Sequence, residues 1–180
     1  ITFGGSAGAG LNLNAAAALA VNAPITVKGA GAVSLTHNTS LPTNLSFGLA
    51  GSGFSGSLTY LNAGGNAQSV SPGNQSLAIN GNGYTLVYSM ADLDAIDGIS
   101  ALTGASVTTY GAGLAGKYAL ASNLNAAGAN YTTGLIAGGG TTDTLPTAFS
   151  GMFEGLGHTI SNLTISGATN YHVGLLGYST

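Results

Sequence analysis

The sequence predicts an all-β fold of the β-solenoid class, in which short strands follow one another as stacked coils. Three observations predict it. Apolar and polar residues alternate in short segments, many of these segments end on asparagine, and similar segments recur 19 to 25 residues apart. Alternation with a period of two gives a strand one buried face, and repeats of roughly 20 to 50 residues are typical of solenoids and related repeat folds.

The alternating segments lie in the first 80 residues. Each has two apolar positions separated by one residue, and Gly, Asn, Ser and Ala fill the connections between segments. The pairs are Leu11/Leu13, Leu19/Val21, Ile25/Val27, Val33/Leu35, Leu45/Phe47, Leu58/Tyr60 and Leu77/Ile79. We expect each pair to mark a strand with one face in the core.

Asparagine closes five of these segments, where its short side chain tolerates left-handed backbone and can bond along a stack. These residues are Asn14, Asn22, Asn38, Asn62 and Asn80. Matching each strand to its nearest copy makes Leu11, Val33, Leu58 and Leu77 equivalent, with spacings of 22, 25 and 19 residues. A hairpin sandwich shows similar alternation, but no Asn-Gly or Asp-Gly dipeptide forms a clean two-residue loop before residue 80, which favours coils.

One segment departs from the strand pattern. Ser89 precedes Asp92 by three residues and apolar residues follow at helical spacing, so we expect a short helix near residues 89–97, lying laterally against the solenoid. The organisation predicted is one continuous rod, a fragment of a longer chain. Residues 1–88 are solenoid coils, and residues 89–180 continue the solenoid with the helix included.

Composition restricts the partners. Only 4% of the 180 residues are charged, against roughly 25% in ordinary soluble domains. Lys28 and Lys117 are the sole basic residues besides histidine, and the formal net charge is −3, which argues against nucleic acid and anionic membranes. No apolar run approaches the ~18 residues of a transmembrane segment. The absence of cysteine excludes disulfides and is compatible with an oxidising exterior.

Two glycine patterns and one acidic cluster are candidate sites for cofactors or metals. The pattern G-x-G-x-x-G occurs at Gly51/Gly53/Gly56 and at Gly111/Gly113/Gly116, but both copies precede strand-like segments instead of opening a helix. Asp92, Asp94 and Asp97 could in principle bind calcium. We interpret them as a solvated helix face with favourable N-terminal charge, and we expect no cofactor and no metal.

Catalytic chemistry has few candidates. Glu154, His158 and His172 could form a metal or acid/base cluster if stacking aligned them. Turn histidines that bond only the backbone are the favoured interpretation. Glycoside cleavage needs two carboxylates facing one groove, and apart from the helix acids the chain offers Asp143 and Glu154. We expect no catalytic residue.

The C-terminal part carries a longer motif. From Phe149 to Ser166 it reads Phe-Ser-Gly-Met-Phe-Glu-Gly-Leu-Gly-His-Thr-Ile-Ser-Asn-Leu-Thr-Ile-Ser, followed by Val173-Gly-Leu-Leu-Gly177. This resembles the segment leading into a GLUG motif in large bacterial exoproteins. Residues 84–96 and 117–125 resemble the stretch that precedes it in filamentous-haemagglutinin-type adhesins.

The resemblance implies a right-handed parallel β-helix exported by a two-partner or autotransporter route. The motif residues are Phe149, Gly151, Phe153, Gly155, Gly157, His158, Ile160, Leu163 and Ile165. Its glycines allow tight corners, and we expect its Phe, Ile and Leu side chains to face inward and stack, with Leu175 and Leu176 beginning the next coil.

The function expected from this resemblance is that of a secreted, cell-surface adhesin shaft without catalytic activity, in contact with host or matrix glycans or proteins. One alternative is an extracellular fibre subunit that self-associates through its solenoid ends. A second is a polysaccharide-active enzyme on a β-helix, using Glu154 and His158. An ice-binding surface ranks last, because the pairs Thr108-Thr109 and Thr141-Thr142 do not recur at coil spacing.

Overall fold

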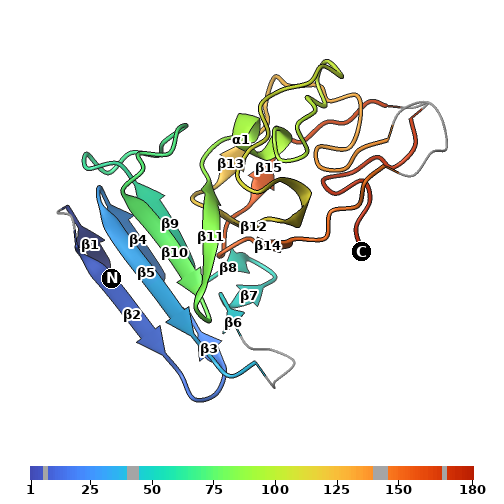
Figure 1. Cartoon of the computed structure of the whole chain (residues 1–180). Coiled ribbons are helices and arrows are strands. Elements are labelled where there is room, and N and C mark those ends of the chain that lie inside the picture. Colours follow the sequence, from blue (N-terminus) through green and yellow to red (C-terminus); the bar gives the residue numbers. More distant parts are fainter. Residues whose placement is uncertain (6–7, 40–44, 140–145, 168–169) are drawn as a thin grey trace. The chain divides into compact units, whose positions relative to one another are not determined.

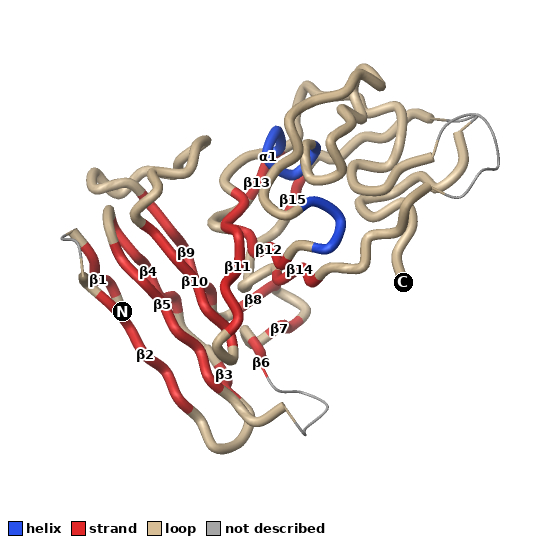
Figure 2. Tube along the Cα trace, in the orientation of Figure 1, coloured by secondary structure: helices blue, strands red, loops and turns tan. Residues whose placement is uncertain are grey.

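The computed structural model describes residues 1–5, 8–39, 45–139, 146–167 and 170–180. Strands are its main regular structure and α-helix forms one short segment, so the predicted all-β class is confirmed (Figures 1 and 2). The chain forms two compact units. The first comprises residues 1–88, 119–123 and 154–159, and the second residues 89–118, 124–153 and 160–180. None of the helices in the described ranges has the length and apolar character to cross a membrane.

The elements are short. In chain order they are β1 (Thr2–Gly4), β2 (Gly10–Asn14), β3 (Leu19–Ala20), β4 (Pro24–Lys28), β5 (Gly31–Thr36), β6 (Leu45–Ser46), β7 (Leu49–Ala50), β8 (Gly53–Phe54), β9 (Ser57–Leu61), β10 (Gln75–Ile79), β11 (Asn82–Val87), α1 (Met90–Asp94), the 3₁₀ turn η1 (Gly113–Ala115), β12 (Lys117–Leu120), β13 (Leu124–Asn125), β14 (Met152–Glu154) and β15 (Ile160–Ser161).

Parallel pairing between successive passes of the chain organises the first unit. Strands β1, β4 and β9 form one parallel sheet, β2, β5 and β10 pair in parallel in a second, and β3 pairs with β6 (Figures 1 and 2). Each strand therefore lies beside its counterpart in the neighbouring pass, in the same chain direction.

The register corrects part of the predicted equivalence. Leu11 lies opposite Val33, as the 22-residue spacing predicts, but Val33 lies opposite Leu77 in the next pass. Leu58 pairs with Ile25 on the other sheet, so its predicted match to Val33 is wrong. The physical reason is that strands on different sides of a coil show the same two-residue alternation, so the pattern does not reveal to which sheet a strand belongs.

Antiparallel pairing interrupts the parallel order among the described strands of the first unit. β10 and β11 form a hairpin through Asn80-Gly81, whose φ angles of 50° and 76° are the left-handed values that a type I′ turn requires. β7 and β8 form a second antiparallel pair. The sheets are thus separate and mixed, and do not make one continuous parallel β-helix along the chain.

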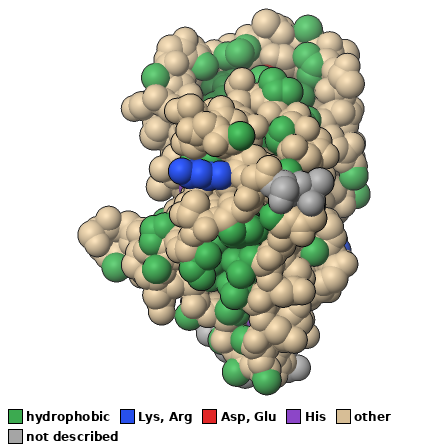
Figure 3. Space-filling model, turned by 90° about the vertical axis from the view of Figure 1, so that its left-hand side faces the viewer, with side chains coloured by type: hydrophobic (Ala, Val, Ile, Leu, Met, Phe, Trp, Pro, Cys, Tyr) green, Lys and Arg blue, Asp and Glu red, His purple; other side chains and the backbone are tan. Residues whose placement is uncertain are grey.

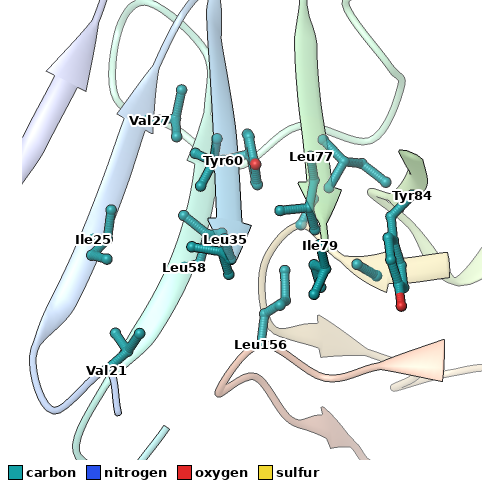
Figure 4. Packing of buried hydrophobic residues seen from close by; sticks show 14 of the residues in the cluster. Val21, Ile25, Val27, Leu35, Leu58, Tyr60, Leu77, Ile79, Tyr84 and Leu156 are labelled. Atoms are coloured by element: carbon teal, nitrogen blue, oxygen red, sulfur yellow. The ribbon is translucent and has the colours of Figure 1, made fainter. Parts of the chain in front are cut away.

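Packing in the first unit follows the alternation. Inward side chains from both parallel sheets meet in one cluster, and Leu35, Leu58, Tyr60 and Val27 are fully buried (Figure 4). The Tyr60 hydroxyl donates to the Ser76 carbonyl oxygen at 3.0 Å, which satisfies its polar end. Each fully buried side chain of this size contributes about 1.5–3 kcal/mol to stability.

The second unit contains the predicted helix. Ser89 caps α1 by accepting from the Asp92 backbone N–H, while the Asp92 carboxylate accepts from the Ser89 backbone N–H, a capping box. Parallel contacts link the two later passes of the chain. They are β13 with β15 and the bridges Tyr131/Ile165, Ile136/Leu176 and Phe149/Ser179.

Candidate functional site

A pocket of about 420 Å³ opens on the first unit beside strand β9. Its walls come from the β8 end, from β9 and from the segments around Asn123 and His158, which lie far apart in sequence. Hydroxyl, amide, imidazole and aromatic side chains line it together with glycine backbone. No Asp, Glu, Lys or Arg is among the described residues of the lining.

Strand alternation aims the β9 hydroxyls at the pocket. Leu58 and Tyr60 are fully buried, so Ser57 and Thr59 point to the opposite face. Backbone bonds then bring the other walls alongside. The Tyr60 N–H donates to the Ala121 carbonyl at 2.8 Å, and the Leu58 N–H donates to that of Leu156 at 3.0 Å.

Glycine is required where the walls meet. A Cβ at Gly157 would collide with the carbonyl oxygen of Gly56, and one at Gly56 would collide with that of Val21. Gly157 also has a φ of 81°, which L-residues rarely adopt. Gly56 is the last glycine of the first G-x-G-x-x-G pattern, and it serves close approach between backbones here.

His158 forms the buried side of the pocket, at 8% exposure. Its Nε2 lies 2.8 Å from the Leu58 carbonyl oxygen, and its Nδ1 lies 3.2 Å from Oδ1 of Asn123. That Oδ1 accepts from the Thr159 N–H at 3.0 Å. Burial lowers the pKa of His158, and the bond to Leu58 opposes this. We therefore assign a neutral ring that donates from Nε2, so it orients the wall and makes the backbone bond expected of a turn histidine.

The motif residues have different surroundings. Phe149 is buried at 4% exposure, as expected, and its ring centroid lies 6.4 Å from that of Tyr118. The expected inward burial is incomplete at the other apolar positions, Phe153, Ile160, Leu163 and Ile165, which are half-buried. Leu156, which alternation did not select, is 1% exposed and has a φ of 50°. Its position between Gly155 and Gly157 was the available signal, because two glycines permit such a turn.

The three acids near α1 are engaged with the backbone. Asp92 accepts from Ser89, Asp94 from the Ala101 N–H at 2.8 Å, and Asp97 from Ile99 and Ala137 at 2.9 Å each. Asp94 is 7% exposed, so the interpretation as a solvated face is wrong for it. Burial raises the pKa of both Asp94 and Asp97. Among the described residues, no three His, Asp or Glu side chains are arranged to hold a metal ion.

The other catalytic candidates, Glu154 and His172, interact with different residues. Burial raises the pKa of Glu154, and the charge of His37 opposes this shift. The pKa of Tyr84 is raised by burial and, to a smaller extent, by the charge of Glu154. The His172 ring lies against Tyr178, with centroids 5.8 Å apart. Asp143 lies outside the described residues.

Comparison with known proteins gives no assignment. No protein-family model, no curated protein and no solved structure matches this chain. The likeness of residues 149–177 to adhesin segments therefore stays a prediction, and function is argued from the residues themselves. Together, fold and site define an all-β chain with an uncharged, hydroxyl-lined pocket.

Proposed function

We propose that this chain is a non-catalytic adhesive segment of a secreted, cell-surface adhesin, and that residues 1–79 are coils of a right-handed parallel β-solenoid. The parallel, in-register pairing of β1 with β4 and β9, and of β2 with β5 and β10, supports the solenoid part of the proposal. The antiparallel strand β11 then marks the place where regular coils end.

The observation that carries the adhesive role is a regular row of hydroxyl and amide groups on the outer face of the strands. Thr2, Thr26 and Thr59 lie side by side on successive strands, and Asn12 lies beside Ser34 on the other sheet. Stacked coils thus repeat hydroxyl and amide groups at the ~4.8 Å strand spacing. Such rows offer many weak hydrogen bonds to a glycan or protein surface, and three threonines in one row are too few to favour ice.

Composition supports the extracellular location. A chain with 4% charged residues and no cysteine has neither the basic clusters that hold nucleic acid nor a thiol that oxidation could damage. The non-catalytic part is supported by the acids, because Asp92, Asp94 and Asp97 each accept backbone hydrogen bonds.

Attachment of the purified chain to epithelial cells and to matrix-coated plates tests this function. We expect binding above an inert protein of the same size, weakened by Thr26→Asp because a carboxylate interrupts the hydroxyl row. Thr164→Asp places the same charge at an exposed position of the second unit and serves as the matched control. Absence of attachment by the intact chain would contradict the proposal.

A second candidate function is self-assembly through the first pass of the chain. β1 and β2 stand at the ends of their sheets, and residues 1–27 contain no charged side chain. The side on which these strands lie faces the viewer in Figure 3, where hydrophobic side chains gather in a patch. Phe3, Leu11, Leu13 and Leu19 are only partly buried. Edges without charge or proline are prone to pair with another chain.

Sedimentation velocity at increasing protein concentration tests the second candidate. Self-assembly predicts a growing population of larger species, and Leu13→Lys should abolish them by placing a charge at the β2 edge. A single monomeric species at all concentrations would remove this candidate and leave the adhesive proposal intact.

A further inference from the structure

The pocket beside β9 presents an aromatic ring at its rim. Phe54 ends β8, lines the pocket and is 40% exposed, which is high for a phenylalanine side chain. The electron-rich face of a phenyl ring attracts weakly positive C–H groups. An exposed ring of this kind suits the apolar face of a ligand whose opposite side is polar.

Hydrogen-bonding groups of both kinds line the same pocket. Ser57, Thr59 and Ser122 supply hydroxyls that donate and accept. Asn123 uses Oδ1 for the Thr159 N–H, whereas its Nδ2 has no hydrogen-bond partner among the described residues. Two amide donors therefore remain for a ligand oxygen.

The lack of charged side chains in the described lining argues against ionic ligands. A carboxylate, sulfate or ammonium group entering it would lose hydration without meeting an opposite charge from the described lining, which is costly. The volume of about 420 Å³ lies in the lower part of the range of roughly 300–1,000 Å³ found for small-molecule sites. A ligand of one or two rings matches this size.

We propose that this pocket binds a neutral saccharide, with one sugar face on Phe54 and its hydroxyls on Thr59 and the Asn123 amide. His158 is a positioning residue, because the bond from its Nε2–H to the Leu58 carbonyl at 2.8 Å fixes the ring in the wall beside Asn123. The biological role of the site rests on the proposed adhesive function, but the binding itself rests on the chemistry of the pocket.

Saturation-transfer NMR and titration of the full chain test the binding. The probes are glucose, galactose, mannose, N-acetylglucosamine and cellobiose, with glucuronic acid and glucosamine as charged comparators. We expect at least one neutral sugar to bind with Kd in the millimolar range, about −4 kcal/mol, and both charged sugars to bind more weakly. No binding by any neutral sugar, or tighter binding of a charged one, would overturn the proposal.

Two substitutions link the binding to the pocket. Phe54→Ala removes the ring, and Asn123→Asp removes the Nδ2 donors while keeping an acceptor for the Thr159 N–H. Each should weaken binding by about fivefold to tenfold. Asn125→Asp is the matched control, because Asn125 likewise accepts a backbone N–H, from Ala127 at 3.0 Å. Binding unchanged in both pocket variants, with circular dichroism showing that they fold, would also overturn the proposal.

Comparing this test with the attachment assay separates the two ideas. If the chain attaches to surfaces but binds none of the neutral sugars, the result supports the adhesive function and overturns the saccharide pocket. If the chain binds a sugar through Phe54 and Asn123 but does not attach to any surface, the result supports the saccharide pocket and contradicts the adhesive function.

Discussion

Asn80 hydrogen-bonds to His37 through both atoms of its amide. The His37 backbone N–H donates to Asn80 Oδ1 at 2.9 Å, and Asn80 Nδ2 lies 3.1 Å from His37 Nε2. The Asn80 backbone N–H also donates to the Leu35 carbonyl at 2.8 Å. Asn80 thus extends the parallel β5–β10 ladder by one step and, with a φ of 50°, begins the turn into β11.

Replacing Asn80 should therefore destabilise the first unit. Asn80→Ala loses the side-chain bonds and leaves a residue that tolerates left-handed backbone poorly, so the free energy of unfolding should fall by about 1–3 kcal/mol. Asn80→Gly loses the same bonds but adopts the backbone readily, so its effect should be smaller. Urea denaturation measures both, and a larger loss for glycine than for alanine would contradict this account.

Burial of Leu35 predicts a large cavity effect. Leu35→Ala should lower the free energy of unfolding by about 2–5 kcal/mol, because the side chain is fully buried between two sheets. Leu49 is 73% exposed, so Leu49→Ala, with the same chemistry, should change stability by less than about 0.5 kcal/mol. Thermal unfolding of both variants checks this, and equal effects would show that the core lies elsewhere.

The motif glycines should differ in their tolerance of alanine. Gly157→Ala meets the Gly56 carbonyl at a φ of 81°, and Gly151→Ala meets the Gly116 carbonyl, so each should cost about 2 kcal/mol or more. At Gly155 the nearest atom to an added Cβ is 3.8 Å away, an ordinary contact, so Gly155→Ala is the matched control. Chemical denaturation of the three variants ranks them, and a costly Gly155→Ala would refute the packing described here.

Stability should fall as the solution becomes mildly acidic because of His158. Burial holds the pKa of His158 below its ordinary 6.5, so the unfolded chain takes up a proton there more readily than the folded one. The stability contributed by the neutral His158 ring is therefore fully present above pH 6.5, and the free energy of unfolding decreases as the pH falls below that value. His158→Gln should reduce this slope in urea titrations between about pH 5 and pH 8. An NMR titration of the His158 ring that gives a pKa above 6.5 would reverse the sign and reject the prediction.

Asp94 should give the opposite dependence. Burial raises its pKa above 3.8, with the hydrogen bonds from Ala101 and Ser100 opposing the shift, so the folded protein holds the proton to higher pH. The stability contributed by the protonated Asp94 carboxyl is fully present below pH 3.8, and it is lost as the pH rises through the pKa of the folded protein. Asp94→Asn keeps an acceptor for the Ala101 N–H and should be more stable than the parent at neutral pH, with little difference in acid. A variant less stable than the parent at neutral pH would contradict this.

Local sequence signals predicted individual elements well. The capping box of Ser89 and Asp92 predicted α1, because its two hydrogen bonds form within three residues. The hairpin between β10 and β11 carried an equally local signal in Asn80-Gly81, the dipeptide that a type I′ turn favours. The segment before residue 80 lacks this dipeptide and predicts uninterrupted coils, whereas the hairpin begins at Asn80 itself.

The candidate site was beyond sequence reasoning. His158 and Asn123 are 35 residues apart, and His158 and Leu58 are 100 apart, so no motif spacing relates them. The threonine row was missed for the same reason, because Thr2, Thr26 and Thr59 follow one another at unequal intervals. Connections of variable length hide a repeat that the strand register restores.

The sequence by itself determined that the chain is all-β, with alternating buried positions, a capped helix and few charged side chains, because each of these depends on composition or on residues close together in the chain. Only the tertiary structure decided which strands pair, that β11 turns back antiparallel, and that β8, β9, Asn123 and His158 share one pocket. Those outcomes depend on which backbone groups and side chains meet across long separations, and a period-two pattern is the same whichever partner a strand takes.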